Sequence, residues 1–322
     1  MEWTDVDTWI ATAGVLTAVA CAIPGVFLLL NRQSMLGDAI SHAVLPGLAI
    51  AFFLSGSREL VPLLAGAVVA GVSTTLLSEV IRQTGRVEPG AALGVVFTTL
   101  FAAGLVLVRL VADKVHLDPA CVLYGSLELA VLDGSPVPPI VWRMATLMAL
   151  NLVLALVFGK ELQAVAFDER HATACGLPAK RLRLGLTMAT AVTAVLAFES
   201  VGSILTIAML IVPAATAFLI CRSVWAMFVV ACLVAAAGAL GGHLLAIGPL
   251  PGLFRILIPS AGGGAWNSAG VMSAATGLIF FGTLFGMEIL RSGHRRFARG
   301  MGPPTCGIRD GIKPHFKDPA AD

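Results

Sequence analysis

Apolar runs of about twenty residues alternate along this chain with short polar connections. The runs are 8–30, 34–54, 61–81, 89–111, 140–158, 184–220, 224–247 and 268–290. The run 184–220 has about twice the usual length and divides best near 199–203. A helix of about 20 apolar residues crosses a bilayer, and backbone groups in lipid require partners within their own segment. The pattern predicts an all-α polytopic membrane protein with eight or nine transmembrane helices.

The composition supports a membrane domain and little else. Hydrophobic residues make up 57% of the 322 residues and charged residues 12%, about half the charge of a soluble protein. The mean hydropathy is +0.91, which excludes a disordered chain. We expect a transmembrane domain at 1–290 with a cytoplasmic segment at 160–183, and a basic flexible tail at 291–322. The net charge of +2 predicts no nucleic-acid partner.

Lysine and arginine residues indicate the orientation in the bilayer. If the N-terminus is outside, the inner segments carry sixteen of these residues and the outer segments carry three. Cytoplasmic loops are enriched in Lys and Arg. The bias predicts a multi-pass protein whose 159–183 segment and C-terminus are cytoplasmic. The second run, 34–54, is the least uniform, so a partly re-entrant segment there would give eight crossings.

The second run holds the most informative polar residues. Asp38 and His42 are four residues apart, so on a helix they share one face. A carboxylate and an imidazole suit Mn²⁺, Fe²⁺ or Zn²⁺, and two ligands suit the weak binding that a translocation path requires. The alternative is an Asp–His contact that stabilises a helix. Pro46 removes the helical donor to the carbonyl of His42, and we expect helix breaks at Pro46 and Pro213.

Other ionisable residues carry weaker signals. Glu199 lies where the double-length run must turn, so it belongs either to an external loop or to the lining of the path. Ionisable groups within a span are costly and each requires a reason. Glu79 lies near a cytoplasmic helix end and needs no special role. Glu199 is therefore a weak candidate for a third metal-contacting residue.

A short helix is predicted within the cytoplasmic segment. Asp168 is a good N-cap and Glu169 suits a first helical turn. Gly176 suits the position just after a helix, and Leu177-Pro178 ends it. Such a helix either docks into a soluble partner or is an ordinary loop helix.

Motifs for nucleotide binding and for hydrolysis are absent from the sequence. The chain has no Gly-x-x-x-x-Gly-Lys-Ser/Thr loop, and neither His-Glu-x-x-His nor Gly-x-Ser-x-Gly occurs. We therefore expect a transporter subunit rather than an enzyme. If transport consumes ATP, another chain binds it.

Three segments together resemble the membrane permease subunit of bacterial ABC importers for zinc, manganese or iron. The segment 32–47 contains Gly-Asp-Ala-x-Ser-His-Ala-x-Leu-Pro-Gly, which resembles the signature of that family. The segment 167–178 is similar to its cytoplasmic coupling segment. The segment 201–217, with Ile-Val-Pro-Ala-Ala-Thr-Ala, resembles a third family stretch.

The resemblance implies a set of partners and roles. Asp38 and His42 would touch the metal within the membrane, and Asp168, Glu169, Gly176, Leu177 and Pro178 would couple to a cytoplasmic ABC ATPase. An extracytoplasmic metal-binding protein would deliver the ion, and a second permease copy, identical or a sister chain, would complete the pore. The metal is cargo, ATP is bound by the partner, and no permanent cofactor is implied. The location implied is the bacterial plasma membrane.

Two departures from the family and three alternatives accompany this interpretation. The connection 248–267 is a longer Gly/Pro-rich loop, and the tail after Arg291 is longer than the family predicts. A permease for metal chelates, haem or vitamin B12 would need no metal-ligand pair. An ion-coupled secondary transporter would use Asp38 as a proton or cation site. A membrane enzyme is the weakest alternative, because no nucleophile–base set appears.

Overall fold

The computed structural model describes residues 4–55, 60–112, 127, 131, 137–247 and 267–300. Within these ranges all regular secondary structure is helical. The helices are α1 (Asp5–Leu30), α2 (Leu36–Ser55), α3 (Leu60–Gly85), α4 (Pro89–Ala112), α7 (Pro139–Phe167), α8 (Glu169–Ala174), α9 (Ala179–Val201), α10 (Ser203–Ile220), α11 (Val224–Ile247) and α13 (Ser268–Gly300). In these ranges nine helices are long and apolar enough to cross a membrane. The all-α multi-pass fold is confirmed, with the larger of the two expected helix counts.

Two helices extend beyond the apolar runs that predicted them. α7 continues to Phe167, so the segment 160–183 is helical on both sides of α8 rather than an open loop. α13 continues to Gly300, so the first ten residues of the expected flexible tail are helical. The chain divides into two units after Thr283, so the described residues 284–300 belong to the second unit. The rest of the tail, from 301, and the loop 248–266 lie outside the described residues.

Helix α1 is the central element of the first unit. It packs against α7, α9, α10 and α11, and most of its length is buried. Its small residues allow close approach, the usual basis of helix packing in lipid. A Cβ atom on Gly25 would overlap the carbonyl oxygen of Leu210 on α10, and one on Gly14 would lie 2.9 Å from the side chain of Met272 on α13. A larger side chain at Gly25 would separate α1 from α10, because the obstacle is backbone, whereas at Gly14 the end of the flexible Met272 side chain would have to move.

A proline within α1 is compensated by a neighbouring helix. Pro24 has no N–H, so the carbonyl of Ala20 loses its helical donor. Asn151 of α7 donates from Nδ2 to that same carbonyl oxygen at 3.0 Å. The Asn151 amide also donates to Thr193 Oγ1 of α9 at 3.0 Å, and it is buried. One side chain therefore joins three helices and satisfies the backbone group that the proline exposes.

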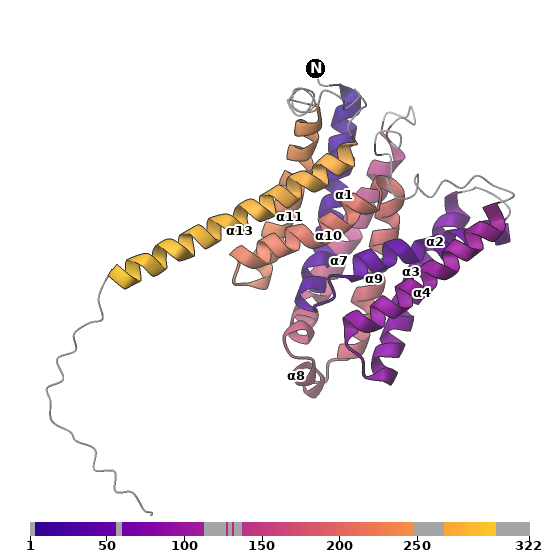
Figure 1. Cartoon of the computed structure of the whole chain (residues 1–322), viewed down its shortest axis with the longest axis horizontal. Helices are drawn as coiled ribbons and strands as arrows, with labels where there is room; N and C mark the ends of the chain where they lie inside the picture. The colour runs from indigo at the N-terminus through magenta and orange to yellow at the C-terminus, as the bar shows by residue number, and fades with distance from the viewer. Residues whose placement is uncertain are drawn as a thin grey trace, which may run out of the picture. The chain divides into compact units, whose positions relative to one another are not determined.

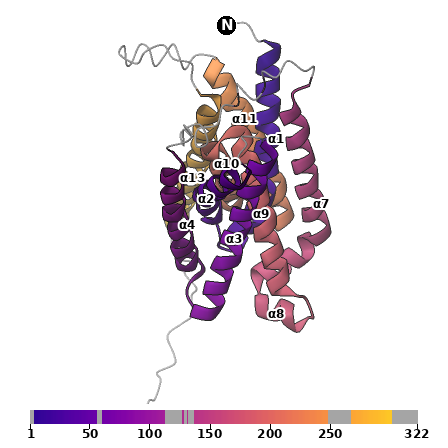
Figure 2. The ribbon, with the colours of Figure 1, turned by 90° about the vertical axis from the view of Figure 1, so that its right-hand side faces the viewer.

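Helices α2, α3 and α4 form a closely packed group. A Cβ atom on Gly66 of α3 would overlap Ala51 Cβ and lie 2.6 Å from the carbonyl oxygen of Gly47, both on α2. A Cβ atom on Gly104 of α4 would lie 2.7 Å from Pro46 Cδ. Figure 1 shows α2 and α10 running obliquely across α1, α7 and α9. In Figures 1 and 2, α8 lies at the end of the bundle opposite the start of α1.

The prediction that helices break at Pro46 and Pro213 is wrong. α2 continues through Pro46 and α10 continues through Pro213. Both prolines are buried, and the helix packing around them holds the backbone helical on either side. Each proline removes one hydrogen-bond donor without ending its helix.

The break in the double-length run occurs at Gly202. This residue has φ +87°, a conformation that favours glycine, and it separates α9 from α10. Val201 and Ser203 on either side are buried. The turn is therefore enclosed by protein, and the external loop expected around 199–203 is not present. Glu199 lies in the last turn of α9, and its side chain lies outside the described parts of the structure.

The bond between Asn151 and Ala20 predicts a specific coupling with Pro24. Asn151→Ala should lower the free energy of unfolding by about 1 kcal/mol, the size of polar contacts between membrane helices. In a Pro24→Ala background the loss should be smaller, because the new alanine supplies the missing helical N–H. Thermal or steric-trap unfolding of all four variants in lipid nanodiscs measures this coupling.

Asn31→Ala is the matched control for this cycle. The Asn31 amide donates to the Phe27 carbonyl of its own helix, so its cost should not depend on residue 24. An equal cost for Asn151→Ala with and without Pro24 would contradict the compensation.

Candidate metal path and coupling segment

Asp38 and His42 lie one helical turn apart near the start of α2. The distance from His42 Nε2 to Asp38 Oδ1 is 3.7 Å, which is too long for a firm hydrogen bond. The Asp38 side chain is 51% exposed and the His42 side chain is 35% exposed. The pair is therefore not locked by internal bonding, and both groups remain open to a ligand.

Aromatic rings of α4 fix the position of the His42 imidazole. Phe97 stacks on it with ring centroids 5.8 Å apart, and Phe101 contacts it edge-on at 5.1 Å. The close contact between Pro46 and Gly104, one turn further along, holds α4 against this part of α2. The aromatic residues limit the rotation of the ring without occupying its nitrogen atoms.

Near this pair, the His42 carbonyl and the Ser41 hydroxyl add oxygen atoms that could contact a metal ion. Pro46 removes the i+4 donor to the carbonyl of His42. Ser41 Oγ donates to the carbonyl of Asp38 at 2.7 Å. Asp38, Ser41, His42 and Leu45 are half-buried, whereas the other positions of this part of α2 are largely buried. These four residues follow helical spacing, so they form one partly open face.

The described part of the chain supplies too few ligands for a tight metal site. Within the described residues, no three His, Cys, Asp or Glu residues come together in a group that could hold a metal ion. Asp38 and His42 are brought together as predicted, while nothing in the described contacts joins Glu199 to them. A carboxylate and a neutral imidazole are nevertheless a donor set that divalent transition metals accept.

The short helix predicted in the cytoplasmic segment is present as α8. Asp168 caps it, because its Oδ1 accepts from the backbone N–H groups of His171 at 3.0 Å and Arg170 at 2.9 Å. These bonds, the one from His171 foremost, lower the pKa of the Asp168 carboxyl. The cap is therefore ionised at neutral pH, the state that best complements a helix N-terminus.

The other end of α8 closes in a Schellman motif. The Leu177 N–H donates to the Ala172 carbonyl and the Gly176 N–H to the Thr173 carbonyl, each at 3.0 Å. Gly176 has φ +85°, and Pro178 begins the turn into α9. Ala172 and Leu177 pack with Val165 of α7 and Ala179 of α9. The helix is thus a rigid projection held by α7 and α9.

An ion-pair network beside α8 was not expected from the sequence. Arg183 of α9 donates from Nη1 to Glu169 Oε2 at 2.6 Å and from Nη2 to Glu79 Oε1 at 3.1 Å. Glu79 of α3 also accepts from Arg82 Nε at 2.9 Å and Nη2 at 2.6 Å. The i,i+3 spacing of Glu79 and Arg82 is visible in the sequence. The link across more than a hundred residues to Arg183 is not.

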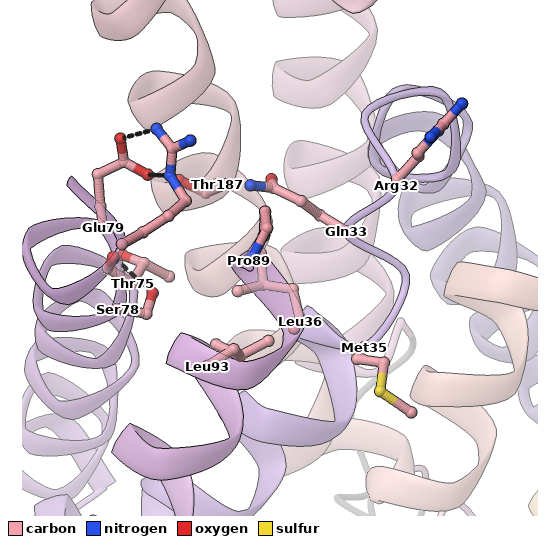
Figure 3. Close-up of a pocket in the computed structure, with 12 residues that line it drawn as sticks. Arg32, Gln33, Met35, Leu36, Thr75, Ser78, Glu79, Pro89, Leu93 and Thr187 are labelled. Carbon is pink, nitrogen blue, oxygen red and sulfur yellow. Dashed lines mark hydrogen bonds and ion pairs between the residues drawn. The ribbon is translucent and has the colours of Figure 1, made fainter. Parts of the chain in front are cut away.

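Figure 3 shows the small cavity beside which Glu79 lies. Its volume is about 60 Å³. Its walls come from the connection between α1 and α2, the first residue of α2, the end of α3, the start of α4 and one residue of α9. The lining residues are Arg32, Gln33, Met35, Leu36, Thr75, Ser78, Glu79, Arg82, Pro89, Gly90, Leu93 and Thr187. The cavity lies about one turn from Asp38 along α2, at the end of the bundle where α3 ends.

These features first define a class: a multi-pass helical membrane protein with a loose carboxylate–imidazole pair on one span and a rigid projection between two others. The model of the ABC 3 transport family matches residues 6–248. The chain belongs to this family, which confirms the resemblance carried by the three segments.

Named relatives agree with this assignment. The chain is 42% identical over 238 residues to the zinc transport system membrane protein TroD of Treponema pallidum, covering 72% of this chain and 65% of that protein. It is 35% identical over 248 residues to the manganese transport system membrane protein MntD of Bacillus subtilis, covering 74% and 83%, respectively. The match therefore spans slightly less than two thirds of TroD and most of MntD.

Solved structures share the same fold. The structure described as PsaBC from Streptococcus pneumoniae in complex with Fab aligns with a TM-score of 0.65 at 26% identity, covering 87% of this chain and 91% of that one. A putative metal-chelate type ABC transporter in an inward-facing conformation aligns with a TM-score of 0.61 at 16% identity. The second likeness concerns the fold alone.

The C-terminal closure of α8 depends on the conformation of Gly176. A Cβ atom there would meet nothing within 4 Å, so Gly176→Ala should cost only the left-handed strain, about 1 kcal/mol. Amide hydrogen exchange across 169–177 should then accelerate by roughly fivefold. Mass-spectrometric exchange on the purified protein measures the change.

Gly176→Asn provides the comparison, because asparagine tolerates the left-handed region. It should exchange close to the wild-type rate. Equal acceleration by alanine and asparagine would show that the strain is not the cause.

Proposed function

We propose that this chain is the membrane permease of an ATP-driven importer of divalent transition-metal ions, Mn²⁺, Zn²⁺ or Fe²⁺. The observation that carries the proposal is the loose Asp38–His42 pair, open on one face of α2 and lying 3.7 Å apart. The donor atoms of the pair suit these metals. Relatives of the chain include proteins named for zinc and manganese transport. Weak coordination allows the ion to leave as well as to enter.

A second permease copy, identical or a sister chain, is part of this proposal. One chain presents a partly open polar face with two ligands, and a partner's face would add further oxygen and nitrogen donors. Family membership supports the pairing, because ABC 3 permeases form the membrane part of multi-subunit transporters. Glu199, near the enclosed turn at Gly202, remains a weak candidate for a further contact with the ion.

The remaining partners follow from the orientation. The Lys/Arg bias supports a cytoplasmic α8 and C-terminus in a bacterial cell, with α1 starting outside. The position of α8 at the opposite end of the bundle from that start is consistent with this orientation (Figure 2). We assign the docking of a cytoplasmic ABC ATPase to Asp168, Glu169, Gly176, Leu177 and Pro178. An extracytoplasmic binding protein would deliver the metal. ATP hydrolysis belongs to the ATPase, and the metal is cargo rather than a resident cofactor.

Transport would proceed by movement of the bundle around the Asp38–His42 pair. Closure of the ATPase would push on α8, and the bundle would alternate between outward- and inward-open states. This chain would position the ion and exclude lipid, and it would break no covalent bond. The transmembrane domain at 1–290 would perform this work, with the tail 291–322 on the cytoplasmic side.

Metal uptake by cells that lack their own importers tests the proposal. The chain is expressed with its ATPase and binding protein as wild type, Asp38→Asn and His42→Ala, and Mn, Zn and Fe are counted by elemental analysis. Each variant should lower uptake of one metal by about tenfold, because a lost ligand contact of ~1.4 kcal/mol corresponds to that factor.

Asp5→Asn is the matched control, since it makes the same chemical change at an exposed position at the start of α1. It should leave uptake unchanged at equal membrane levels. Unchanged uptake in both site variants would refute the metal path. Uptake of none of the three metals by the wild type would refute the importer and favour chelate or ion-coupled transport.

A further inference from the structure

Arg183 connects three elements that are far apart in the sequence. Its Nη1 and Nη2 atoms bind Glu169 on α8 and Glu79 on α3, at 2.6 Å and 3.1 Å. The Arg183 side chain is 11% exposed and that of Glu79 is 16% exposed. A guanidinium group holds two carboxylates in a fixed planar geometry, and charge-assisted bonds of this length are strong ones.

The α3 end of this connection is itself fixed. Glu79 accepts two bonds from Arg82 and one from Gln83 Nε2 at 2.6 Å. Its carboxylate is therefore held by two donor side chains of its own helix, and it cannot follow Arg183 without α3. The α8 end is fixed by the Asp168 cap and the Schellman motif. The Glu79 carboxylate is therefore fixed with respect to α3, and Glu169 belongs to a helix whose two ends are both closed.

The ion pairs join α8 to a helix that its apolar contacts do not reach. The apolar cluster around Ala172 contains residues of α7, α8, α9 and the intervening turn. Glu169 instead reaches Arg183, whose second nitrogen reaches α3. Through Arg183, a displacement of α8 is passed to α3 as well as to the helices on which α8 sits.

Close packing carries such a displacement from α3 to α2. Gly66 and Gly47 allow the two backbones to touch, with Ala51 and Ala70 filling the remaining space. Contacts at this distance leave no room for α3 to move without α2. Asp38 and His42 are on α2, so α3 displacement reaches the candidate metal ligands.

We propose that Arg183 is the positioning residue that transmits movement of α8 to α3, and thereby to the Asp38–His42 pair. This role rests on the proposed docking of the ATPase at α8. Arg183 contacts neither metal nor nucleotide; it acts by holding Glu169 and Glu79 at once. A lysine would retain the positive charge but would lose the planar fork that serves two carboxylates.

The test measures ATP hydrolysed per metal ion transported in proteoliposomes of the whole importer. The variants are Glu79→Gln, which removes the charged α3 partner of Arg183, Arg183→Lys, and the pair combined. Each single variant should hydrolyse ATP at close to the wild-type rate while the ratio of ATP to metal rises about three- to tenfold, the range of coupling energies along packed networks. The double variant should match either single variant, because both break the same link.

Two exposed residues at the same end of the bundle serve as controls. Glu88→Gln, just before α4, and Arg181→Lys, two residues before Arg183, make the same chemical changes. Both should leave the ratio of ATP to metal at the wild-type value. A general effect of lost charge would move the controls as well and would overturn the role of Arg183.

Other outcomes also decide the proposal. A wild-type ratio in Glu79→Gln and Arg183→Lys vesicles that do transport metal would overturn the transmission role and leave the proposed importer intact. Loss of the ATPase from the Arg183→Lys complex would overturn it too, since the contact would then serve assembly. Wild-type vesicles that transport none of Mn²⁺, Zn²⁺ and Fe²⁺ would instead remove the proposed function on which the inference rests.

Discussion

The constraint on which this structure depends is that a backbone carbonyl in a bilayer requires a hydrogen-bond donor. Among the described residues, Pro24, Pro46 and Pro213 lie inside helices long enough to span the membrane, and each removes one such donor. At Pro24 the missing donor is replaced by Asn151 from another helix. That replacement ties the central helix α1 to α7 and, through Thr193, to α9. A local defect in one helix thereby specifies how three helices meet.

At Pro46 the missing helical donor is not replaced by the contacts described above. This proline lies one turn beyond His42, and its ring packs against Gly104 of α4, so the helix remains held while one donor to the His42 carbonyl is absent. The Asp38 and His42 side chains on this face are half-buried and lie 3.7 Å apart, too far for a firm hydrogen bond. In the proposed importer, the same backbone chemistry that stabilises the centre of the bundle provides oxygen atoms near the ion.

The sequence was sufficient wherever a signal is local. Spans follow from apolar length, and α8 follows from Asp168 and Gly176, whose cap and left-handed conformation the structure reproduces. It was insufficient where partners are distant. The sequence left Glu199 either in an external loop or in the lining of the path, because a double-length run must turn, and the structure makes that turn at the buried Gly202. Glu79 looked ordinary because Arg183, its partner on α9, is 104 positions away, and hydrophobic periodicity carries no information about such pairs.

The two charged clusters differ in the property that their proposed roles require. Arg183, Glu79 and Arg82 are mostly buried and joined by bonds as short as 2.6 Å, so separating them would leave charges in a poorly solvated place, at high cost. Such a cluster transmits movement because it does not come apart. Asp38 and His42 are more exposed and lie 3.7 Å apart, so water or a metal ion can enter between them at little cost. A path for a passing ion needs ligands that release, and a mechanical link needs partners that do not.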